Sequence, residues 1–486
     1  MVPRHPPRLP ASDRTLFALV NEATLANPFG ERRASLDRQM ATLAPASGPP
    51  AARPAAIARV AERVARLEAE GRARPSAWAE PDRELVSLTL LFDAFHRYVP
   101  AFDAHIAAQH RGGDESAAVP FAREALALLA RRGFGPEEGR RYFAFFYQLR
   151  RAFFFVDRAL VGRSASMRAL RERLWRNVFT DDLRTYVLHL WNRMEDFSTL
   201  LLGETGTGKG AAAAALGRSG FIPFDERRGA FSVSFTRGFL AINLSQYPET
   251  LIESELFGHR KGAFTGAIEQ HEGVFARGSP HGAIFLDEIG DVSGPVQIKL
   301  LQVLQERTFS AVGSHERQRF SGRVIAATNR PLDRLRREGR LRDDFYYRLS
   351  SDVVLVPPLR QRLAEHPGEL ELLVASVLGR LAGDAASDLA PRVLEALDRG
   401  VGRGYAWPGN VRELEQAVRR ILVDGRYTGE AASAGAGWPE RLARGIEAGT
   451  LDAATLVGGY CALLHERHRT YEEVARRTGL DRRTVK

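Results

Sequence analysis

A short glycine-rich segment follows an apolar stretch near the middle of the chain, and its residue types suit phosphate binding. Residues 199–202 are apolar and predict a strand, while the small residues after Lys209 predict a helix. Glycines between them let a loop wrap a phosphate with its backbone N–H groups, and the helix N-terminus and a lysine add positive charge. The predicted nucleotide-binding residues are Gly203, Glu204, Thr205, Gly206, Thr207, Gly208, Lys209 and Gly210.

Two further apolar stretches end in polar residues that fit the same chemistry. Residues 283–286 run into Asp287 and Glu288, and residues 323–327 run towards Asn329. An aspartate at the carboxyl end of a strand can hold Mg²⁺ through water, and a neighbouring glutamate can orient or deprotonate an attacking water. We therefore expect ATP and Mg²⁺ as cofactors, Asp287 as the metal ligand, Glu288 as the catalytic base and Asn329 as a sensor of the γ-phosphate.

The elements that must position these residues alternate along the chain. Apolar runs ending in Gly or Asp-Glu alternate with amphipathic stretches, which is typical of βα units and a parallel sheet. Helical periodicity dominates before them, and eight aromatic residues within 142–155 predict a buried helix or a packing surface towards the next region of the chain. The expected domains are a mostly helical regulatory region 1–158, an α/β core 159–356, a helical lid 357–427, a linker 428–450 and a small helical unit 451–486.

Composition narrows the class of protein further. The chain has 486 residues, a formal net charge of +10 and one cysteine, Cys461, which excludes a disulfide framework. No signal peptide or uninterrupted apolar span is evident, so we expect a cytoplasmic protein without membrane contact. Only four of the 69 basic residues are lysine, so a lysine rather than an arginine at position 209 is informative. Residues 1–208 contain no lysine. A phosphorylatable receiver domain needs a lysine, so a ligand-binding or protein-binding input region is expected.

A hexapeptide points to a known family. The residues that carry the resemblance are Gly262, Ala263, Phe264, Thr265, Gly266 and Ala267. This GAFTGA sequence resembles the signature of bacterial enhancer-binding proteins, the AAA+ ATPases that activate sigma-54 RNA polymerase. The resemblance covers residues 160–425 and the C-terminal unit, and further motifs agree in order at 253–259, 285–290, 345–349, 357–360 and 407–414.

The resemblance implies an AAA+ module, an α/β core with a helical lid, that works as a homo-oligomeric ring, commonly a hexamer. Its hexapeptide loop would contact sigma-54, with Phe264 and Thr265 at the tip. Four further residues match family positions: Arg342 and Arg348 the arginines that reach the neighbouring ATP site, Arg412 the sensor arginine, and Asn243 the asparagine that restrains the catalytic glutamate.

Three features depart from the family pattern. Gly210 stands where the family usually has glutamate and where phosphate loops in general have serine or threonine. The segments 181–198 and 221–238 are longer than is typical. The glycine raises the alternative that the nucleotide acts as a switch with little turnover.

The last residues resemble a Fis-type helix-turn-helix. Thr470 and Glu473 predict a capping box, and a second helix begins after Asp481. Expected contacts to double-stranded enhancer DNA are Arg482, Arg483, Thr484 and Lys486. The recognition helix would stop after six residues, so we expect either that the sequence is cut short or that DNA binding is weak.

These features favour a sigma-54-dependent activator that hydrolyses ATP to remodel the closed promoter complex. One alternative is a DNA-binding regulator that uses ATP binding as a switch. Another is a different AAA+ remodeller such as a helicase loader, against which the hexapeptide argues. The signal sensed by the N-terminal region cannot be deduced from these residues.

Overall fold

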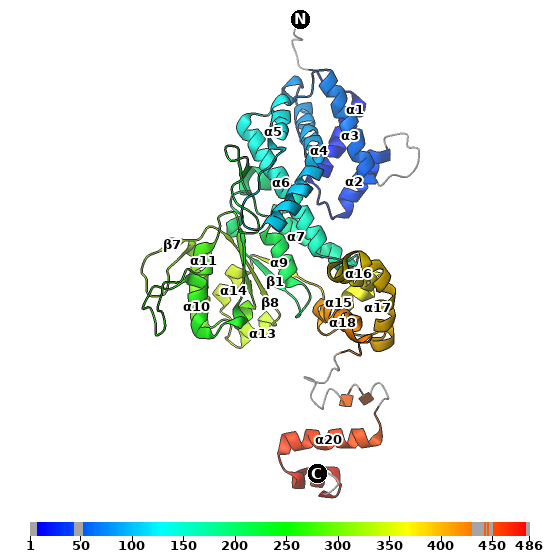
Figure 1. Cartoon of the computed structure of the whole chain (residues 1–486), viewed down its shortest axis with the longest axis vertical. Coiled ribbons are helices and arrows are strands. Elements are labelled where there is room, and N and C mark those ends of the chain that lie inside the picture. The colour runs from blue at the N-terminus through cyan, green and yellow to red at the C-terminus, as the bar shows by residue number, and fades with distance from the viewer. Residues whose placement is uncertain (1–6, 43–51, 430–441, 444, 447–450, 483–486) are drawn as a thin grey trace. The chain divides into compact units, whose positions relative to one another are not determined.

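The computed structural model describes residues 7–42, 52–429, 442–443, 445–446 and 451–482 (Figure 1). The chain forms two compact units. Residues 1–390 and 406–416 make the first, and residues 391–405 and 417–486 make the second. Within the described residues, no helix is long and apolar enough to cross a bilayer.

The first unit begins with a bundle of helices. Their bounds are α1 Ala11–Leu25, α2 Glu31–Thr42, α3 Ala52–Ala69, α4 Asp82–Gly112, α5 Ala122–Arg131, α6 Pro136–Ala159 and α7 Ala165–Phe179. Short turns follow at α8 Leu183–Thr185, η2 Tyr186–Leu190 and η3 Met194–Asp196. The predicted helical character of the N-terminal region is confirmed, and helices extend beyond the expected boundary at residue 158.

The centre of the first unit is a parallel sheet of five strands in the order β4-β5-β8-β1-β9. The strands are β1 Thr199–Leu202, β4 Phe239–Asn243, β5 Ala283–Asp287, β8 Arg323–Thr328 and β9 Asp352–Leu355. The strand β1 lies between β8 and β9, far from its neighbours in sequence. Ligands bind at the carboxyl ends of strands where the order changes in this way. The α/β core is therefore as predicted.

Alternate strand residues pack into two different cores. On one side, Leu201, Phe285 and Ile325 join the residues of the N-terminal helices and of α9 (Lys209–Gly217). On the other side, Leu200 and Ile284 pack with a second set of helices. The bounds in that set are α10 Glu249–Phe257, α11 Val274–Arg277, α12 Gly294–Glu306, α13 Leu332–Arg337 and α14 Asp343–Leu349. Both faces are thus buried, as parallel sheets require.

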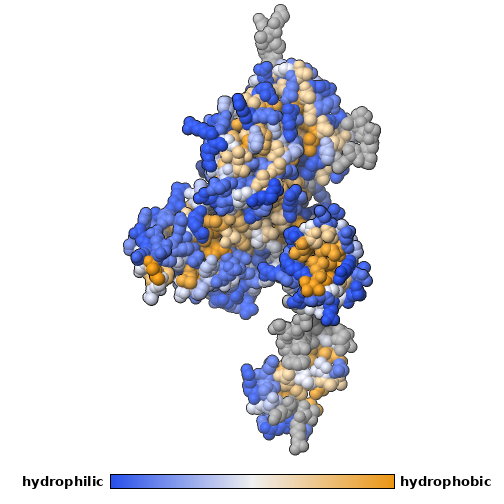
Figure 2. Space-filling model, in the orientation of Figure 1, coloured by the Kyte–Doolittle hydropathy of each residue, from blue (hydrophilic) through white to orange (hydrophobic). Residues whose placement is uncertain are grey.

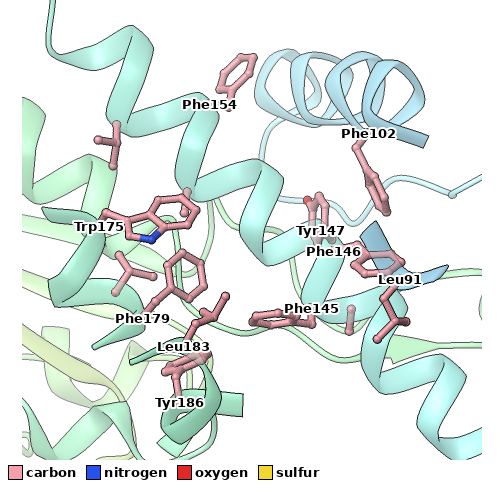
Figure 3. Packing of buried hydrophobic residues seen from close by; sticks show 14 of the residues in the cluster. Leu91, Phe102, Phe145, Phe146, Tyr147, Phe154, Trp175, Phe179, Leu183 and Tyr186 are labelled. Atoms are coloured by element: carbon pink, nitrogen blue, oxygen red, sulfur yellow. The ribbon is translucent and has the colours of Figure 1, made fainter. Parts of the chain in front are cut away.

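The aromatic helix α6 is the link between the N-terminal bundle and the α/β core. Pro136 at its first turn and two glutamates after it favour the helix start. The helix packs against α9, and its residues belong to the same hydrophobic core as the sheet (Figure 3). The sequence predicted a buried helix or a packing surface, and α6 is both.

The two segments that are longer than the family pattern both contact α6. The hairpin of β2 (Phe224–Asp225) and β3 (Ala230–Phe231) lies in the segment 221–238. Phe231 stacks on Tyr147 with ring centroids 3.7 Å apart. In the segment 181–198, the Tyr186 hydroxyl oxygen accepts a hydrogen bond from Gln148 at 2.6 Å. The additional residues therefore dock the N-terminal helices onto the core.

A buried arginine of β8 connects α7 to the sheet through hydrogen bonds. Arg323 donates to the Phe197 carbonyl at 2.9 Å and to the side chains of Asn177 and Thr199 at 2.8 and 3.0 Å. Burial lowers the pKa of Arg323 to about 10. Its guanidinium stays charged at neutral pH and needs these acceptors, so α7 cannot leave the sheet without exposing or stranding the charge.

The lid and the C-terminal helices follow β9. Their bounds are α15 Leu359–Glu365, α16 Glu369–Ala382, α17 Ala386–Val401, α18 Asn410–Asp424, α20 Ala453–His468 and α21 Tyr471–Thr478, with short strands β6 Thr308–Phe309 and β7 Gln318–Arg319 earlier in the chain. In the second unit, Cys461 and Leu464 of α20 pack on Val474 of α21.

Residues around α21 differ from the prediction in one respect. Thr470 precedes α21 but makes no capping hydrogen bond with its side chain. Glu473 instead pairs with Arg476 and Arg477 at 2.6 and 2.7 Å, and these bonds lower its pKa to about 2. The capping-box prediction is wrong because two nearby guanidinium groups compete for the same carboxylate.

Removal of the Phe231 side chain tests whether bundle and core unfold together. Phe231→Ala should lower the free energy of unfolding by about 3–5 kcal/mol, since it empties a buried aromatic site shared by both parts. The control Phe197→Ala, at a residue 38% exposed, should cost about 1 kcal/mol or less. Urea unfolding followed by circular dichroism provides the measurement, and separate transitions for bundle and core would contradict a shared core.

Candidate functional site: a nucleotide site at the carboxyl ends of the strands

The phosphate loop has the geometry that its glycines predict. It leaves β1 after Leu202 and enters α9 at Lys209. Gly206 and Gly208 have φ of +78° and +104°, in the region where residues with a side chain are strained. The loop therefore turns within seven residues and brings backbone N–H groups to the start of a helix, which favours an anion.

Lys209 lies inside this loop. Its Nζ atom donates to the carbonyl oxygens of Gly203 at 2.8 Å and Glu204 at 3.1 Å. Burial lowers the pKa of Lys209, and the nearby carboxylates of Glu288 and Asp287 partly offset that effect. The ammonium group is thus held against its own loop and is available to an incoming phosphate.

Glu288 lies directly after β5 in a left-handed backbone conformation, with φ of +57°. The backbone N–H of Asn329 reaches its Oε2 atom at 3.4 Å. Burial and the neighbouring Asp287 raise the pKa of Glu288, while Lys209 opposes them. A carboxylate with a raised pKa beside a lysine is suited to accept a proton from water.

Asn329, the predicted sensor of the γ-phosphate, also lies beside the phosphate loop. It follows β8, the strand adjacent to β1, and its Nδ2 atom donates to the Thr205 hydroxyl at 2.8 Å. The phosphate loop, the residues after β5 and the asparagine after β8 therefore meet at one edge of the sheet.

The start of α18 also touches the phosphate loop. Asn410 donates to Glu204 at 3.1 Å and to the Thr205 carbonyl at 3.0 Å. The backbone N–H of Arg412 donates to the Gly206 carbonyl at 3.3 Å. The predicted sensor arginine is thus beside the loop, and its charge contributes to the lowered pKa of Lys209.

An ion pair that the sequence analysis missed joins the lid to the loop. Arg360 of α15 binds both oxygens of Glu204 at 2.6 and 2.8 Å. This contact lowers the pKa of the Glu204 carboxyl, first through the hydrogen bonds from Arg360. The signal was available: a carboxylate inside a phosphate-binding loop needs a cation to neutralise it.

Three predicted residues are not part of this group. The Asn243 side-chain oxygen accepts from the backbone and hydroxyl of Ser245 at 3.0 and 2.8 Å, with no bond to Glu288 among the described contacts. Arg342 pairs with Asp344 at 2.7 Å, and Arg348 donates to the Leu304 carbonyl at 3.0 Å. Their predicted roles in catalysis remain predictions.

The predicted magnesium site has one predicted protein ligand, the Asp287 carboxylate. Among the described residues, no group of three or more His, Cys, Asp or Glu side chains could hold a metal. Asp287 is the predicted ligand, so the remaining oxygens must come from nucleotide and water. Gly210 adds no hydroxyl, although a β-carbon there would meet nothing within 4 Å.

The hexapeptide lies in a loop that leaves the core between α10 and α11. Gly262 N–H donates to the Ala267 carbonyl at 2.8 Å, which closes the loop, and Gly262 and Gly266 have φ of +79° and +100°. Phe264 and Ile268 are 36% and 77% exposed, and Figure 2 shows hydrophobic surface at the outer edge of this region. An apolar tip held in water suits contact with a partner.

The base of this loop is narrow. Gly258 and Gly273 face each other so closely that a β-carbon on Gly273 would lie 2.2 Å from the Gly258 nitrogen. His259 then supports the loop, because its ring packs on Phe264 and bonds the Ser254 hydroxyl at 2.6 Å. Phe264 and Thr265 are therefore exposed on a loop that is supported by packing contacts at its base.

The predicted DNA contacts are only partly described. Arg482 is exposed and pairs with Glu472 at 2.8 Å. Arg483, Thr484 and Lys486 lie outside the described residues.

Comparison with known proteins identifies the core. A profile described as the sigma-54 interaction domain matches residues 181–354. The Nif-specific regulatory protein of Azotobacter vinelandii is 38% identical over 282 residues, which are 57% of this chain and 47% of that protein. Residues 181–354 thus resemble the sigma-54 interaction domain. The regulator NtrC of Azospirillum brasilense is 39% identical over 266 residues, which are 54% of this chain and 48% of that protein.

The similarity to these two regulatory proteins is confined to part of the sequence. The chain spans about half the length of the two relatives. The structure of NtrX from Brucella abortus aligns with 75% of this chain and 79% of that chain at a TM-score of 0.41 and 22% identity. The fold is established by the strand order β4-β5-β8-β1-β9 of the parallel sheet. The matched domain starts at residue 181, after α7.

A β-carbon at Gly206 tests the contact between the phosphate loop and α18. Gly206→Ala would place that carbon 2.2 Å from the Gly409 carbonyl oxygen in a strained backbone conformation. We expect ATP affinity to fall by at least about tenfold, measured with a fluorescent nucleotide. Gly294→Ala, where a β-carbon meets nothing within 4 Å, is the matched control. Unchanged affinity of the first variant would mean that the loop and α18 do not meet during nucleotide binding.

Proposed function

We propose that this chain hydrolyses ATP to activate sigma-54 RNA polymerase from upstream DNA. The observation that carries the proposal is the meeting of Lys209, Glu288 and Asn329 at one edge of the sheet, in a core from which the hexapeptide loop projects between α10 and α11. A nucleotide site alone would support many activities. Its presence in one core with an exposed GAFTGA loop favours mechanical work on a partner.

Each residue has a specific task in ATP hydrolysis. Lys209 would leave the two loop carbonyls and bind the β- and γ-phosphates, with the N–H groups of the loop and the start of α9 around them. Asp287 would hold Mg²⁺, which neutralises phosphate charge. Asn329 would bind the γ-phosphate or the attacking water from the position where it now meets Thr205.

Glu288 is the proposed general base. Burial, and after it the neighbouring Asp287, raise the pKa of Glu288 above the ordinary value of a glutamate. Turnover should therefore fall on acidification as Glu288 takes up a proton, at a higher pH than for an exposed glutamate. The nearby Lys209 ammonium opposes this rise in the pKa of Glu288.

Completion of the site is proposed to need a neighbouring subunit. Arg342 and Arg348 lie on or next to α14 and make no contact with the phosphate loop of their own chain among the described interactions. In a ring, commonly a hexamer in this family, they would approach the adjacent nucleotide. An arginine there stabilises charge on the transferred phosphoryl group.

The hexapeptide loop is the proposed contact to sigma-54, and the C-terminal helices are the proposed contact to enhancer DNA. Exposed Phe264 and its neighbour Thr265 would bind sigma-54, and the paired glycines allow the loop to change shape with nucleotide state. Arg482 and the residues after it would contact DNA phosphates. We place this activity in the cytoplasm, where promoters and polymerase are located.

One observation favours a second candidate, a regulator that binds ATP as a switch. Gly210 lacks the side chain that holds Mg²⁺ in most phosphate loops. Nucleotide binding would then change the contacts of Glu204 and Arg412 with little turnover.

Replacement of the proposed base separates the two candidates. Glu288→Gln should lower ATP turnover by at least about a hundredfold and leave nucleotide binding in place, because only proton transfer is lost. Glu249→Gln, at an exposed position on α10, is the control and should behave as the parent protein. Phosphate release and fluorescent-nucleotide binding provide the measurements. A parent protein that turns over no faster than Glu288→Gln would favour the switch.

A second variant tests the hexapeptide loop. Thr265→Ala should abolish open-complex formation by sigma-54 RNA polymerase, since its side chain lies at the exposed tip, while ATP turnover stays within about twofold. The matched control is Thr250→Ala on α10, which is exposed but outside the loop. Potassium permanganate footprinting of a supercoiled promoter detects the open complex. Normal promoter opening by Thr265→Ala would refute the assignment of this loop.

A further inference from the structure

The N-terminal helices surround a cavity of about 530 Å³. Its lining comes from α1, α2, α3, α4, α6, α7 and the segment 183–188, and it includes none of the nucleotide-site residues. Protein interiors contain few voids larger than a water molecule, whereas small-molecule sites occupy roughly 300–1,000 Å³. A space of this size within a helical bundle therefore suits a ligand.

The walls of the cavity are mainly apolar and aromatic. Leu91 and Phe95 of α4 face Phe146 and Phe153 of α6, with Trp175 of α7 beside them. Figure 3 shows side chains of α6, α7 and the following segment meeting in this part of the molecule. Flat aromatic walls favour an apolar body, above all an aromatic ring system.

The polar lining carries positive charge. Asp37 accepts from the Nε atoms of Arg33 and Arg53, each at 2.9 Å, and Asp103 binds Arg150 at 2.6 and 2.7 Å. Each of these three arginines keeps one terminal nitrogen with no hydrogen-bond partner among the described residues. Such a nitrogen can donate to an anionic group.

A neutral histidine lies between these arginines. Burial lowers the pKa of His96 to about 3, and Arg33, Arg53 and Arg150 contribute to the lowering by repulsion. The cavity therefore disfavours a cation. Glu84, the one carboxylate of the lining, is already paired with Arg184 at 2.9 Å. An acidic group would meet unsatisfied donors and no unpaired carboxylate.

The opposite side of α6 holds the end of the phosphate-loop helix. Gln148 donates to the Ser219 carbonyl at 3.0 Å, and buried Arg151 donates to the Gly220 carbonyl. Both acceptors follow the last residue of α9, the helix that begins at Lys209. A molecule against Phe146 and Phe153 thus rests on the helix that fixes α9.

We propose that this cavity binds an apolar organic acid, with an aromatic or short acyl body and one anionic group, and that its occupancy is coupled through α6 to the nucleotide site. The coupling, unlike the binding, rests on the proposed function. The aromatic walls receive the body, and Arg33, Arg53 and Arg150 receive the anionic group.

Two fluorescent probes that differ in one group test the ligand class. 8-Anilinonaphthalene-1-sulfonate has an apolar aromatic body with an anionic group, and N-phenyl-1-naphthylamine has the same rings without it. The full-length protein should bind the sulfonate saturably at one site per chain and more tightly than the uncharged probe. Equal or tighter binding of the uncharged probe would overturn the acidic part of the proposal.

Two matched serine variants locate the binding. Ser87→Phe projects a ring into the cavity and should weaken sulfonate binding by at least about tenfold. Ser76→Phe adds the same ring at an exposed position outside the lining and should leave it unchanged. Circular dichroism reports whether each variant folds. If Ser87→Phe does not fold, Thr24→Phe fills the cavity from α1 instead. Equal affinity in the parent and the folded cavity variants would overturn the site.

Linkage to ATP tests the coupling without requiring turnover. Saturating ATP should change the sulfonate affinity by at least about fivefold, because coupling between two sites is reciprocal. An unchanged affinity would overturn the coupling. Sulfonate binding that persists in Ser87→Phe and is displaced by ATP would belong to the nucleotide site and would also overturn the proposal. A protein that binds the probe but never hydrolyses ATP would refute the proposed function and retain the cavity site.

Discussion

Alanine occupies every position from 211 to 215 in α9, the helix that follows the phosphate loop. Such a helix presents little apolar area, so it cannot by itself cover the sheet face on which it lies. The aromatic side chains of α6 supply the missing volume, and small alanine side chains let the two helices approach closely. The N-terminal helices are therefore part of the structure that supports the nucleotide site. Loss of their packing would uncover the sheet.

This arrangement holds α9 at both ends. At its start the helix carries Lys209 and the nucleotide loop, and just beyond its end Gln148 and Arg151 bind the Ser219 and Gly220 carbonyls. Burial lowers the pKa of Arg151, and two of its nitrogens have no partner among the described residues. A buried cation of this kind is strongly dependent on its few acceptors. A displacement of α6 is thus expected to move α9 first and the strands of the sheet afterwards.

The nucleotide site could be predicted because its signals are local. A glycine loop, an Asp-Glu pair after a strand and an asparagine after another strand each appear within a few residues, and a parallel sheet brings strand ends together. The contact of Arg360 with Glu204 joins residues that are 156 positions apart in the sequence, and no local spacing pattern predicts it. The aromatic run of α6 revealed burial but not its partner, since aromatic residues pack equally well on many surfaces. The capping box predicted at Thr470 does not form, because the Glu473 carboxylate pairs with nearby guanidinium groups instead of a backbone N–H.

Shared burial has a consequence for how such a protein can change over generations. Input regions joined by a flexible linker can be exchanged by recombination, because each part keeps its own core. Here Phe231 of the hairpin stacks on Tyr147 of α6, so replacement of the N-terminal helices by unrelated ones would leave that aromatic surface exposed. The segments 181–198 and 221–238 both contact α6 and are expected to change together with it. Substitutions at this shared surface are therefore expected to need compensation in the other part.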